Sequence, residues 1–422
     1  MAKFLLCALV FALCFVSTES RPIFIHSRKV YNVVDYGAVG DGLVDDTKAF
    51  MDAWKATCKS SMSSPTMHVP QGMTFLLQPL TFNGNCKSNN ITVQVHIQID
   101  GTIIAPSDPS AWKCPDDKCL RWIEFHDFKG LLIRGSGTIN GQGKKWWDLK
   151  CKENKRICGR KPTGFVIGGS NNVHIDGLTF EDSPQMHIAF ESSEWVKATS
   201  LTIQAPKHSP NTDGIHIQHS KNIIIYNTSI GTGDDCISIG DGSSHINISK
   251  IDCGPGHGIS IGSLGKDGKH ETVEFVHVKD VSFTGTTNGA RIKTWQGGKG
   301  YARNITFEHI TSIGSARPVI IDQYYCDHKV HKHCGNHRSA VRVSNIVYDQ
   351  IYGTSDKKIA VEFSCSKSVP CYNIIMRNIN LHSTEDGTQT SSICQNVRGL
   401  RNGDIIPDVP CLNEAENLSI MN

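Results

Sequence analysis

Three short segments, spaced 22 residues apart, carry the residues that could do chemistry. They read Asp213-Gly-Ile-His-Ile, Asp235-Cys-Ile-Ser-Ile and His257-Gly-Ile-Ser-Ile. In each segment a polar residue stands two positions before an Ile-x-Ile pair. An even repeat with one alternating strand is typical of a solenoid, in which equivalent positions of successive coils stack about 4.8 Å apart. Two carboxyl groups and an imidazole are therefore expected to meet on one surface.

Asp234 adds a third carboxyl group beside Asp235. Hydrolysis of a glycosidic bond needs one carboxylic acid to protonate the leaving oxygen and one carboxylate to activate water or attack. Crowded carboxyl groups raise one another's proton affinity, which favours one protonated member near neutral pH. Neighbours along a strand point to opposite faces, so Asp234 and Asp235 share a face only if a turn intervenes. Thr232-Gly233 predicts such a turn. A lone Gly-Asp-Asp turn is more often structural, but acids and a histidine on adjacent coils favour catalysis.

Two cations follow on the next predicted coil. In Arg291-Ile-Lys293 the apolar residue faces inward and both charges face outward. Arg can hold a substrate carboxylate through two bonds, and Lys can hold it as a point charge. A structural ion pair with the aspartates is the alternative, and the two roles are compatible. Tyr325, one coil further, offers a ring and a hydroxyl to a sugar.

The elements that position these residues are short strands. A motif of asparagine, an aliphatic residue, any residue and an apolar residue recurs along the chain, and the matching strand ends lie 23 to 30 residues apart. This step is too short for strand–helix–strand crossovers. We predict an all-β, single-domain parallel β-helix of about ten coils. A repeated asparagine favours either a ladder of side-chain hydrogen bonds or a left-handed corner. The motif begins at Asn172, Asn222, Asn247 (in part), Asn304, Asn345 and Asn373.

The ends of a solenoid need covers. After a short strand over Tyr31–Val34, an apolar face formed by Ala49, Phe50, Ala53 and Trp54 predicts a helix that caps the first coil, with Asp45 or Asp46 at its start. The tail after Cys371 is expected to seal the last coil.

Residues 1–20 have the pattern of a secretory signal peptide, so the mature domain is expected to span residues 21–422. No later apolar run is long enough for a membrane span. The 14 cysteines outside the signal are an even number in an oxidising compartment, which predicts disulfides. Neighbour pairing gives Cys58/Cys86, Cys114/Cys119, Cys151/Cys158, Cys236/Cys253, Cys326/Cys334, Cys365/Cys371 and Cys394/Cys411. Possible glycan acceptors are Asn90, Asn227, Asn247, Asn304 and Asn417. A net charge of +3 is compatible with an acidic substrate.

Two insertions keep alternative interpretations open. The segment 144–161 is rich in Lys and Arg and is either a solvated loop or a rim that attracts an anionic polymer. The segment from Cys326 to His337 holds four histidines, and we favour a disulfide with surface histidines over a zinc site.

Four motifs in order resemble the plant polygalacturonases of glycoside hydrolase family 28. They are Asn211-Thr-Asp-Gly, Gly233-Asp-Asp, Gly256-His-Gly and Arg291-Ile-Lys. The flanking strings Thr294-Trp-Gln-Gly-Gly and Tyr36-Gly-Ala-x-Gly-Asp-Gly extend the likeness, which runs from about residue 31 to 411. One local difference is Tyr324, where an asparagine is expected.

The resemblance implies a right-handed parallel β-helix that hydrolyses α-1,4-galacturonosyl bonds of pectin with inversion. Carried onto this chain, it makes Asp234 the general acid, with Asp213 and Asp235 activating water. His257 would lie beside the acid and help set its protonation.

The resemblance also implies a substrate-binding set, namely Arg291 and Lys293 for the galacturonate carboxylate, with Tyr325 and Asn211 contacting the sugar. No cofactor, metal, nucleic acid or membrane partner is expected, and the protein is expected to be a secreted, cell-wall monomer.

Three alternatives remain open at this stage. Exo-action instead of endo-action depends on loops that the motifs do not describe. A pectate lyase would need calcium and an arginine base, and no calcium loop is evident. A catalytically silent wall-polysaccharide binder would keep the cations but could lose an aspartate, and all three are present.

Overall fold

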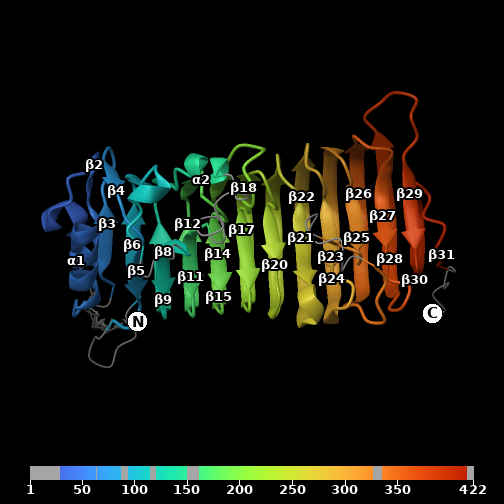
Figure 1. Cartoon of the computed structure of the whole chain (residues 1–422), viewed down its shortest axis with the longest axis horizontal. Helices are drawn as coiled ribbons and strands as arrows, with labels where there is room; N and C mark the ends of the chain where they lie inside the picture. The colour runs from blue at the N-terminus through green and yellow to red at the C-terminus, as the bar shows by residue number, and fades with distance from the viewer. Residues whose placement is uncertain are drawn as a thin grey trace, which may run out of the picture.

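The computed structural model describes residues 29–62, 64–86, 94–114, 120–149, 161–326 and 335–415. The chain forms a right-handed parallel β-helix, in which each strand pairs in parallel with the equivalent strand of the next coil. Figure 1 shows the coils stacked in sequence order from the helix α1 at one end to β31 at the other. The predicted all-β solenoid is therefore confirmed.

One sheet has eleven strands, which agrees with the predicted number of about ten coils. Its strands are β5 (Leu80–Asn83), β8 (Arg121–His126), β11 (Thr163–Gly168), β14 (Ile188–Glu191), β17 (Ile215–Gln218), β19 (Ile237–Ile239), β21 (Ile259–Leu264), β23 (Ala290–Thr294), β25 (Val319–Asp322), β27 (Ile359–Ser364) and β29 (Ser391–Gln395).

The other sheet has twenty strands and forms the remaining walls of the coils. Its strands are β1 (Val30–Asn32), β2 (Asp41–Asp45), β3 (Thr66–Val69), β4 (Thr74–Leu76), β6 (Val95–Ile99), β7 (Thr102–Ile104), β9 (Lys129–Arg134), β10 (Thr138–Asn140), β12 (Asn171–Asp176), β13 (Thr179–Glu181), β15 (Glu194–Thr199), β16 (Thr202–Gln204), β18 (Lys221–Gly231), β20 (Ser243–Cys253), β22 (His270–Thr284), β24 (Lys299–Ser315), β26 (Arg342–Ser355), β28 (Cys371–Ser383), β30 (Val397–Ile406) and β31 (Asn413–Glu414). From β18 onward, strands that are separate in earlier coils run together, since β15 and β16 both pair with β18.

The core is a set of apolar ladders that run along the solenoid axis. Ile215 lies opposite Ile237, which lies opposite Ile259, and all three are fully buried. Because strand residues alternate between faces, the residue between the two isoleucines of each pair faces outward. The even spacing in the sequence therefore fixes which side chains line the outer face of the eleven-stranded sheet.

The repeated asparagine occupies a left-handed corner, and part of the series also forms a ladder. Asn172, Asn222, Asn304, Asn345 and Asn373 have φ values between 54° and 58°, but in the coil of Asn247 the corner residue is His245, also with a φ of 58°. The side-chain amide of Asn345 donates to Asn304 at 3.0 Å, and that of Asn373 donates to Asn345 at 2.8 Å. Asparagine tolerates positive φ better than most residues and pairs with its own kind. The left-handed corner is therefore confirmed at five of the six predicted asparagines, and the ladder joins Asn304, Asn345 and Asn373, whereas the partial motif at Asn247 was assigned to the corner wrongly.

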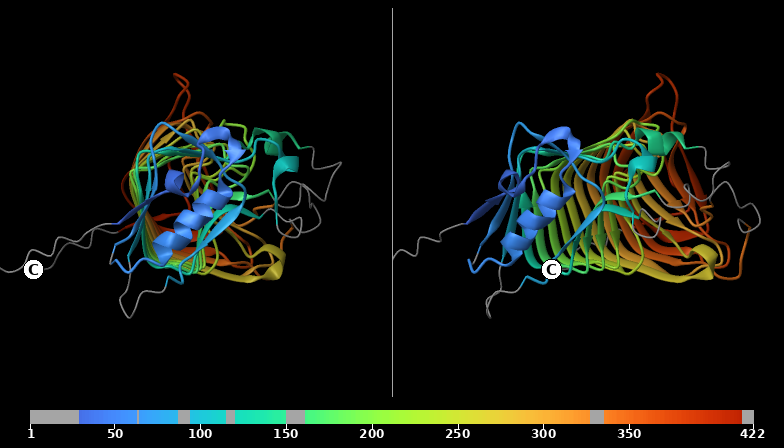
Figure 2. Two further views of the ribbon diagram at one scale, coloured as in Figure 1. Left: turned by 90° about the vertical axis from the view of Figure 1, so that its left-hand side faces the viewer. Right: turned by 60° about the vertical axis from the view of Figure 1, so that its left-hand side comes forward.

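The helix α1 (Thr47–Cys58) covers the first coil, as predicted. Figure 2 shows it lying across the open end of the stack. Its Phe50 ring packs edge-on against Phe75 with centroids 5.3 Å apart, and its Trp54 ring contacts Phe82 at 5.4 Å. This contact buries the apolar end of the solenoid core.

One detail at this end differs from the sequence prediction, and the choice between Asp45 and Asp46 as the capping residue is settled. The first strand stops at Asn32, because Val33–Tyr36 forms a 3₁₀ turn that ends at the left-handed Gly37. Asp46 is the N-cap residue of α1, but its carboxylate accepts from the main-chain N–H groups of Val39 and Gly40 instead of the helix. Asp45 accepts from the N–H of Thr47 at 3.2 Å and supplies the capping bond.

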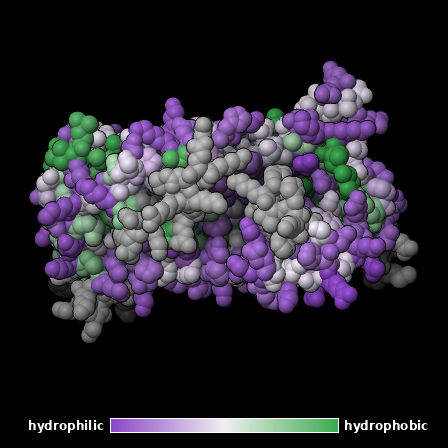
Figure 3. Space-filling model, viewed as in Figure 1, coloured by the Kyte–Doolittle hydropathy of each residue, from purple (hydrophilic) through white to green (hydrophobic). Residues whose placement is uncertain are grey.

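In the described ranges the remaining helices are α2 (Lys144–Asp148) and the 3₁₀ turns η2 (Pro109–Ala111) and η4 (Lys266–Gly268). Of the helices in the described ranges, none is long and apolar enough to cross a lipid bilayer. Hydrophilic residues predominate on the face shown in Figure 3.

Four of the predicted disulfides are present, namely Cys58–Cys86, Cys236–Cys253, Cys365–Cys371 and Cys394–Cys411. The other three pairs each include a cysteine outside the described residues. The signal peptide, residues 150–160 of the basic insertion and residues 327–334 of the histidine-rich insertion also lie outside them.

Candidate active site

The three chemically active segments lie on adjacent coils. Strands β17, β19 and β21 are neighbours in the eleven-stranded sheet, in the register that the 22-residue spacing predicts. The main-chain N–H of Gly214 donates to the carbonyl of Asp235 at 2.9 Å, so the stacking continues into the turns that precede the strands. Asp213, Asp235 and His257 therefore begin three successive rungs.

A tight turn brings Asp234 and Asp235 together on one side. Gly233 makes this turn possible, because an added Cβ would lie 2.0 Å from the carbonyl oxygen of Ser209. The N–H of Asp235 donates to Oδ1 of Asp234 at 2.8 Å. The intervening turn that the sequence predicted is confirmed.

Asp235 is buried and held by three partners. Its side chain is 1% exposed, and Nζ of Lys293 donates to Oδ2 at 2.7 Å. Arg291 forms an ion pair with Oδ1, to which the Ser260 hydroxyl also donates at 2.8 Å. Burial acts to raise the pKa of Asp235, but the charges of Arg291 and Lys293 outweigh it and lower the pKa to about 2. This carboxyl group is ionised across the physiological range.

Asp213 has the opposite electrostatics. It is buried, and Oδ2 accepts from the Ser238 hydroxyl at 2.7 Å. Burial, followed by the charges of Asp234 and Asp235, raises the pKa of Asp213 to about 7, against the opposing effects of Lys293 and Ser238. Asp213 is therefore an acid whose pKa is raised by its neighbours, and it can be protonated near neutral pH.

Asp234 is the most accessible of the three acids, with a side chain that is 20% exposed. Its Oδ1 lies 3.1 Å from Nδ1 of His257, and its carbonyl accepts from the N–H of His257 at 2.8 Å. The His257 side chain is 36% exposed. His257 thus lies beside Asp234, as the sequence comparison with the hydrolase motif implied.

Arg291 and Lys293 lie on the outer face of β23, with Ile292 buried between them. Both form ion pairs with Asp235, so the structural alternative raised by the sequence is correct. Nζ of Lys293 also lies 5.4 Å from the centre of the Tyr325 ring, which packs edge-on against Trp295. The predicted Tyr325 therefore stands next to the cations.

Asn211 is exposed in the turn before Asp213, with a φ of 58°. The Thr212 hydroxyl fixes this turn, since it donates to the Ser209 carbonyl at 3.0 Å and accepts from the N–H of Gly233 at 3.1 Å. These bonds tie the Asp213 turn to the Asp234 turn of the next coil.

Sequence reasoning missed the polar residues between the isoleucines. His216, Ser238 and Ser260 lie opposite one another in consecutive strands, and Ser260 lies opposite the predicted Arg291. Ser238 and Ser260 bond to the two buried aspartates, and Nδ1 of His216 lies 2.8 Å from the Ser238 hydroxyl. The signal was present, because the middle residue of every Ile-x-Ile pair must face the side on which the acids lie.

One oxygen each of Asp234 and Asp235 and a ring nitrogen of His257 lie within 4.8 Å of one another, a grouping that is also seen in cation sites. Two fixed cations already balance Asp235, which disfavours a further positive charge. The donor set therefore fits acid–base chemistry better than metal binding.

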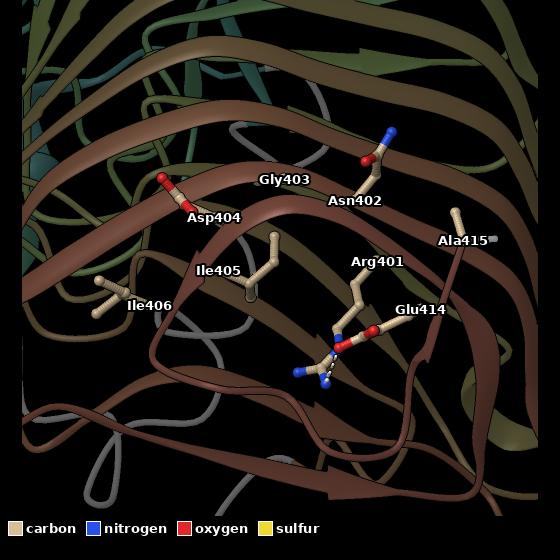
Figure 4. Close-up of a pocket in the computed structure, with 8 residues that line it drawn as sticks. All are labelled: Arg401, Asn402, Gly403, Asp404, Ile405, Ile406, Glu414 and Ala415. Carbon is tan, nitrogen blue, oxygen red and sulfur yellow. Dashed lines mark hydrogen bonds and ion pairs between the residues drawn. The ribbon is translucent and has the colours of Figure 1, made fainter. Parts of the chain in front are cut away.

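A separate cavity of about 480 Å³ lies at the C-terminal end (Figure 4). It is lined by the last coil, where Arg401 pairs with Glu414 at 3.2 Å. None of the predicted site residues lines it.

The comparisons with known proteins agree with this geometry. The family model described as "Glycosyl hydrolases family 28" matches residues 58–404. A polygalacturonase of Persea americana is 47% identical over 367 residues, which are 87% of this chain and 76% of that protein. Polygalacturonase-2 of Solanum lycopersicum is 42% identical over 394 residues, which are 93% of this chain and 83% of that protein.

Solved structures share the fold. An endo-xylogalacturonan hydrolase from Aspergillus tubingensis has a TM-score of 0.75 at 24% identity and covers 92% of this chain and 100% of that one. A polygalacturonase from Erwinia carotovora has a TM-score of 0.68 at 23% identity, over 89% and 97% of the two chains. By the extent of the family match and of the plant relatives, the chain belongs to glycosyl hydrolases family 28.

Proposed function

We propose that this protein is a polygalacturonase that hydrolyses α-1,4-galacturonosyl bonds within pectin, with inversion and by internal cleavage. The observation that carries the proposal is the opposite electrostatics of two aspartates on adjacent coils, beside a third and more exposed one. A hydrolase of this kind needs a protonated and an ionised carboxyl group at the same pH.

Asp234 is proposed as the general acid, because it is the most accessible acid and so the best placed to reach a leaving oxygen. Asp213 and Asp235 are proposed to activate water. Asp213 holds a proton up to about pH 7, while Asp235 stays ionised. We propose that this proton serves the general acid, which leaves Asp213 ionised to activate water. His257 is proposed to orient Asp234 and adjust its protonation.

Arg291 and Lys293 are proposed to bind the galacturonate carboxylate while holding Asp235 ionised. Each has donors beyond those that Asp235 uses, since Arg has five N–H groups and Lys has three. Tyr325 is proposed to pack against a sugar ring, and Asn211 to contact the substrate from the rim.

The preference for internal cleavage rests on the flanking motifs, and the alternative is attack from chain ends. We further propose that residues 1–20 are removed on secretion, and that residues 21–422 act as a monomer in the plant cell wall. This setting agrees with the disulfides and with the plant relatives.

The test is incubation of the purified protein with de-esterified polygalacturonate and a chelator. Reducing ends without new ultraviolet absorbance are expected, together with an early fall in viscosity. A slow fall in viscosity would indicate attack from chain ends. Absorbance that appears only when calcium is restored would identify a lyase, and binding without any product would identify a silent wall-polysaccharide binder.

A further inference from the structure

Two serines stand behind the two buried aspartates. Ser238 donates to Oδ2 of Asp213 at 2.7 Å, and Ser260 donates to Oδ1 of Asp235 at 2.8 Å. The serines lie opposite each other on β19 and β21. Each carboxyl group therefore has a serine as its partner. The two differ in the group that bonds to the serine from its other side, which is His216 for Ser238 and Arg291 for Ser260.

The third group behind Asp235 can only donate. Nε of Arg291 donates to the Ser260 hydroxyl at 2.7 Å. A guanidinium has no acceptor, so the hydroxyl accepts from Arg291 and its own hydrogen is left for Asp235. The direction of this chain of bonds is fixed and favours the ionised carboxylate.

The third group behind Asp213 can donate or accept. Nδ1 of His216 lies 2.8 Å from the Ser238 hydroxyl, and Nε2 lies 3.1 Å from Oε1 of Gln218. Burial lowers the pKa of His216, so the ring is neutral and carries one proton. With an amide oxygen facing Nε2, that proton belongs on Nε2, and Nδ1 is an acceptor.

The Ser238 hydroxyl consequently has one hydrogen to donate and two possible acceptors, Oδ2 of Asp213 and Nδ1 of His216. When the hydrogen points to Asp213, it stabilises the ionised carboxylate. When it points to Nδ1 of His216, the short contact between Ser238 and Asp213 is a hydrogen bond only if Asp213 itself is protonated and donates. The bond can therefore reverse with the protonation state of Asp213.

We propose that Ser238 and His216 are positioning residues that control whether Asp213 holds or releases its proton. Donation from Ser238 to Asp213 stabilises the ionised carboxylate and so promotes release of the proton that Asp213 holds, and His216 competes for that donation. This inference deepens the proposed hydrolase function and rests on it for the activity measurements below.

We call the hydrogen-bonded series Asp213–Ser238–His216 the relay. The charged and titratable groups around it stay the same in every variant proposed below. Asp234, Asp235 and Lys293 face Asp213, and its carbonyl oxygen lies 3.2 Å from Nδ1 of His187, whose pKa burial lowers to about 4. The charges that act on His216 are those of Glu191, Lys293 and Asp235. Because none of these changes in the variants below, a shift in the pH profile reports the relay itself.

The first variant is Ser238→Ala, which deletes the donor. Ionised Asp213 loses a hydrogen bond, so the cluster holds its proton more tightly and the proton stays on Asp213. The alkaline limb of the kcat profile is expected to move up by roughly one pH unit, and kcat to fall about tenfold. Change in KM is expected to be smaller.

The second variant is His216→Phe, which deletes the competing acceptor. The hydroxyl of Ser238 then always serves Asp213, and the alkaline limb is expected to move down, opposite to Ser238→Ala. Gln218→Leu gives a second route to the same result, because it frees the proton of His216 to move to Nδ1 and donate. The double variant His216→Phe/Ser238→Ala is expected to match Ser238→Ala.

The matched control is Ser220→Ala. Ser220 is also a buried serine, in the connection between β17 and β18, but its hydroxyl bonds to the main-chain carbonyls of Phe190 and Gln218 and not to an acid. The Ser220→Ala variant is expected to have a lower free energy of unfolding and an unchanged alkaline limb in its profile of kcat against pH. Shifts of one sign for Ser238→Ala and His216→Phe, or no shift in either, would overturn the relay.

A measurement without substrate separates this inference from the proposed function. The free energy of unfolding is followed from pH 4 to 8, where Asp213 makes it depend on pH. The upper end of that window is expected to move up in Ser238→Ala and down in His216→Phe. Opposite shifts in a protein that does not cleave polygalacturonate would retain the relay and reject the proposed function, whereas normal cleavage without such shifts would do the reverse.

Discussion

Asp213 and Asp235 occupy equivalent positions on adjacent coils, yet their pKa values move in opposite directions. Both are buried, and burial alone would raise both pKa values. The difference comes from Arg291 and Lys293, which contact Asp235 directly. Two residues from a strand two coils beyond β19 thus separate the acids into an ionised member and a protonatable one, as acid–base hydrolysis requires.

Replacing Asp234 by Asn is expected to lower kcat by about 10²–10⁴-fold, because the amide cannot protonate the leaving oxygen. Binding of polygalacturonate and the unfolding midpoint are expected to change little, since Asp234 is partly exposed. Reducing-end release gives kcat, and a pull-down with insoluble polymer gives binding. Wild-type turnover in this variant would remove Asp234 from the acid role.

The raised pKa of Asp213 also predicts a change of stability with pH. Its folded-state value of about 7 lies above its ordinary value, so folding is favoured at low pH, and this contribution is lost as pH rises from about 4 to 7. Asp213→Asn removes the ionisation and is expected to be more stable than the wild type at pH 7 by up to about 4 kcal/mol, with little difference near pH 4. Urea unfolding at the two pH values measures this. An equal difference at both would contradict the assignment.

The value of kcat should also depend on the proton of Asp213. As pH rises through about 7, the cluster loses the proton that the general acid needs, so kcat is expected to fall tenfold per pH unit above that point. A profile of kcat against pH on a fixed oligogalacturonate tests this. Constant kcat from pH 6 to 9 would show that the acid draws its proton from another group.

At the scale of elements, the strand β19 has only three residues but carries the turn with Asp234 and Asp235 at its start. The disulfide between Cys236 and Cys253 ties that turn to the end of β20. The Thr212 hydroxyl secures the other side of the turn, because it accepts from the N–H of Gly233 and donates to the carbonyl of Ser209. A covalent link here limits the motion of a short strand that few bonds hold.

Removing this disulfide with Cys236→Ala/Cys253→Ala is expected to cost about 2–4 kcal/mol of unfolding free energy. We expect kcat to fall as well, because the Asp234 turn loses its anchor. Cys394→Ala/Cys411→Ala, at the far end of the solenoid, is the control and should lower stability without lowering kcat. Equal effects of the two pairs on kcat would contradict a local role.

At the scale of the whole molecule, the solenoid behaves as a line of nearest neighbours. Each coil contacts chiefly the coils on either side, so the ends are the weak points and need covers. The helix α1 closes the N-terminal end, while β31 pairs with only two residues of β30 at the other end. The active site lies on the middle coils, away from both ends (Figure 1).

Trp54→Ala in α1 is expected to cost about 3–5 kcal/mol, because it leaves a cavity between the helix and the first coil. Activity below the unfolding transition should be unchanged, since the acids lie several coils away. Calorimetry and kcat at 25 °C measure the two effects. A parallel loss of kcat in the folded variant would show that the cap and the site are coupled. Leu43→Ala, on the exposed surface nearby, is the control.

The sequence by itself determined the fold class, the register and which acids lie on adjacent coils. This was possible because an even spacing leaves one way to stack Ile215, Ile237 and Ile259 with their outer neighbours aligned. The asparagine corners followed from the same repeat. The first strand was predicted too long, because its end depends on how the 3₁₀ turn packs under α1.

Only the tertiary structure decided how the acids differ. Asp213 and Asp235 both stand two positions before an Ile-x-Ile pair, but their proton affinities depend on burial and on cations that lie 56 and 58 residues beyond Asp235. The structural role of Arg291 could be assigned only from its ion pair with Asp235. The roles of Ser238 and His216 also needed the measured distances, because hydrogen-bond direction depends on which atoms face each other across coils.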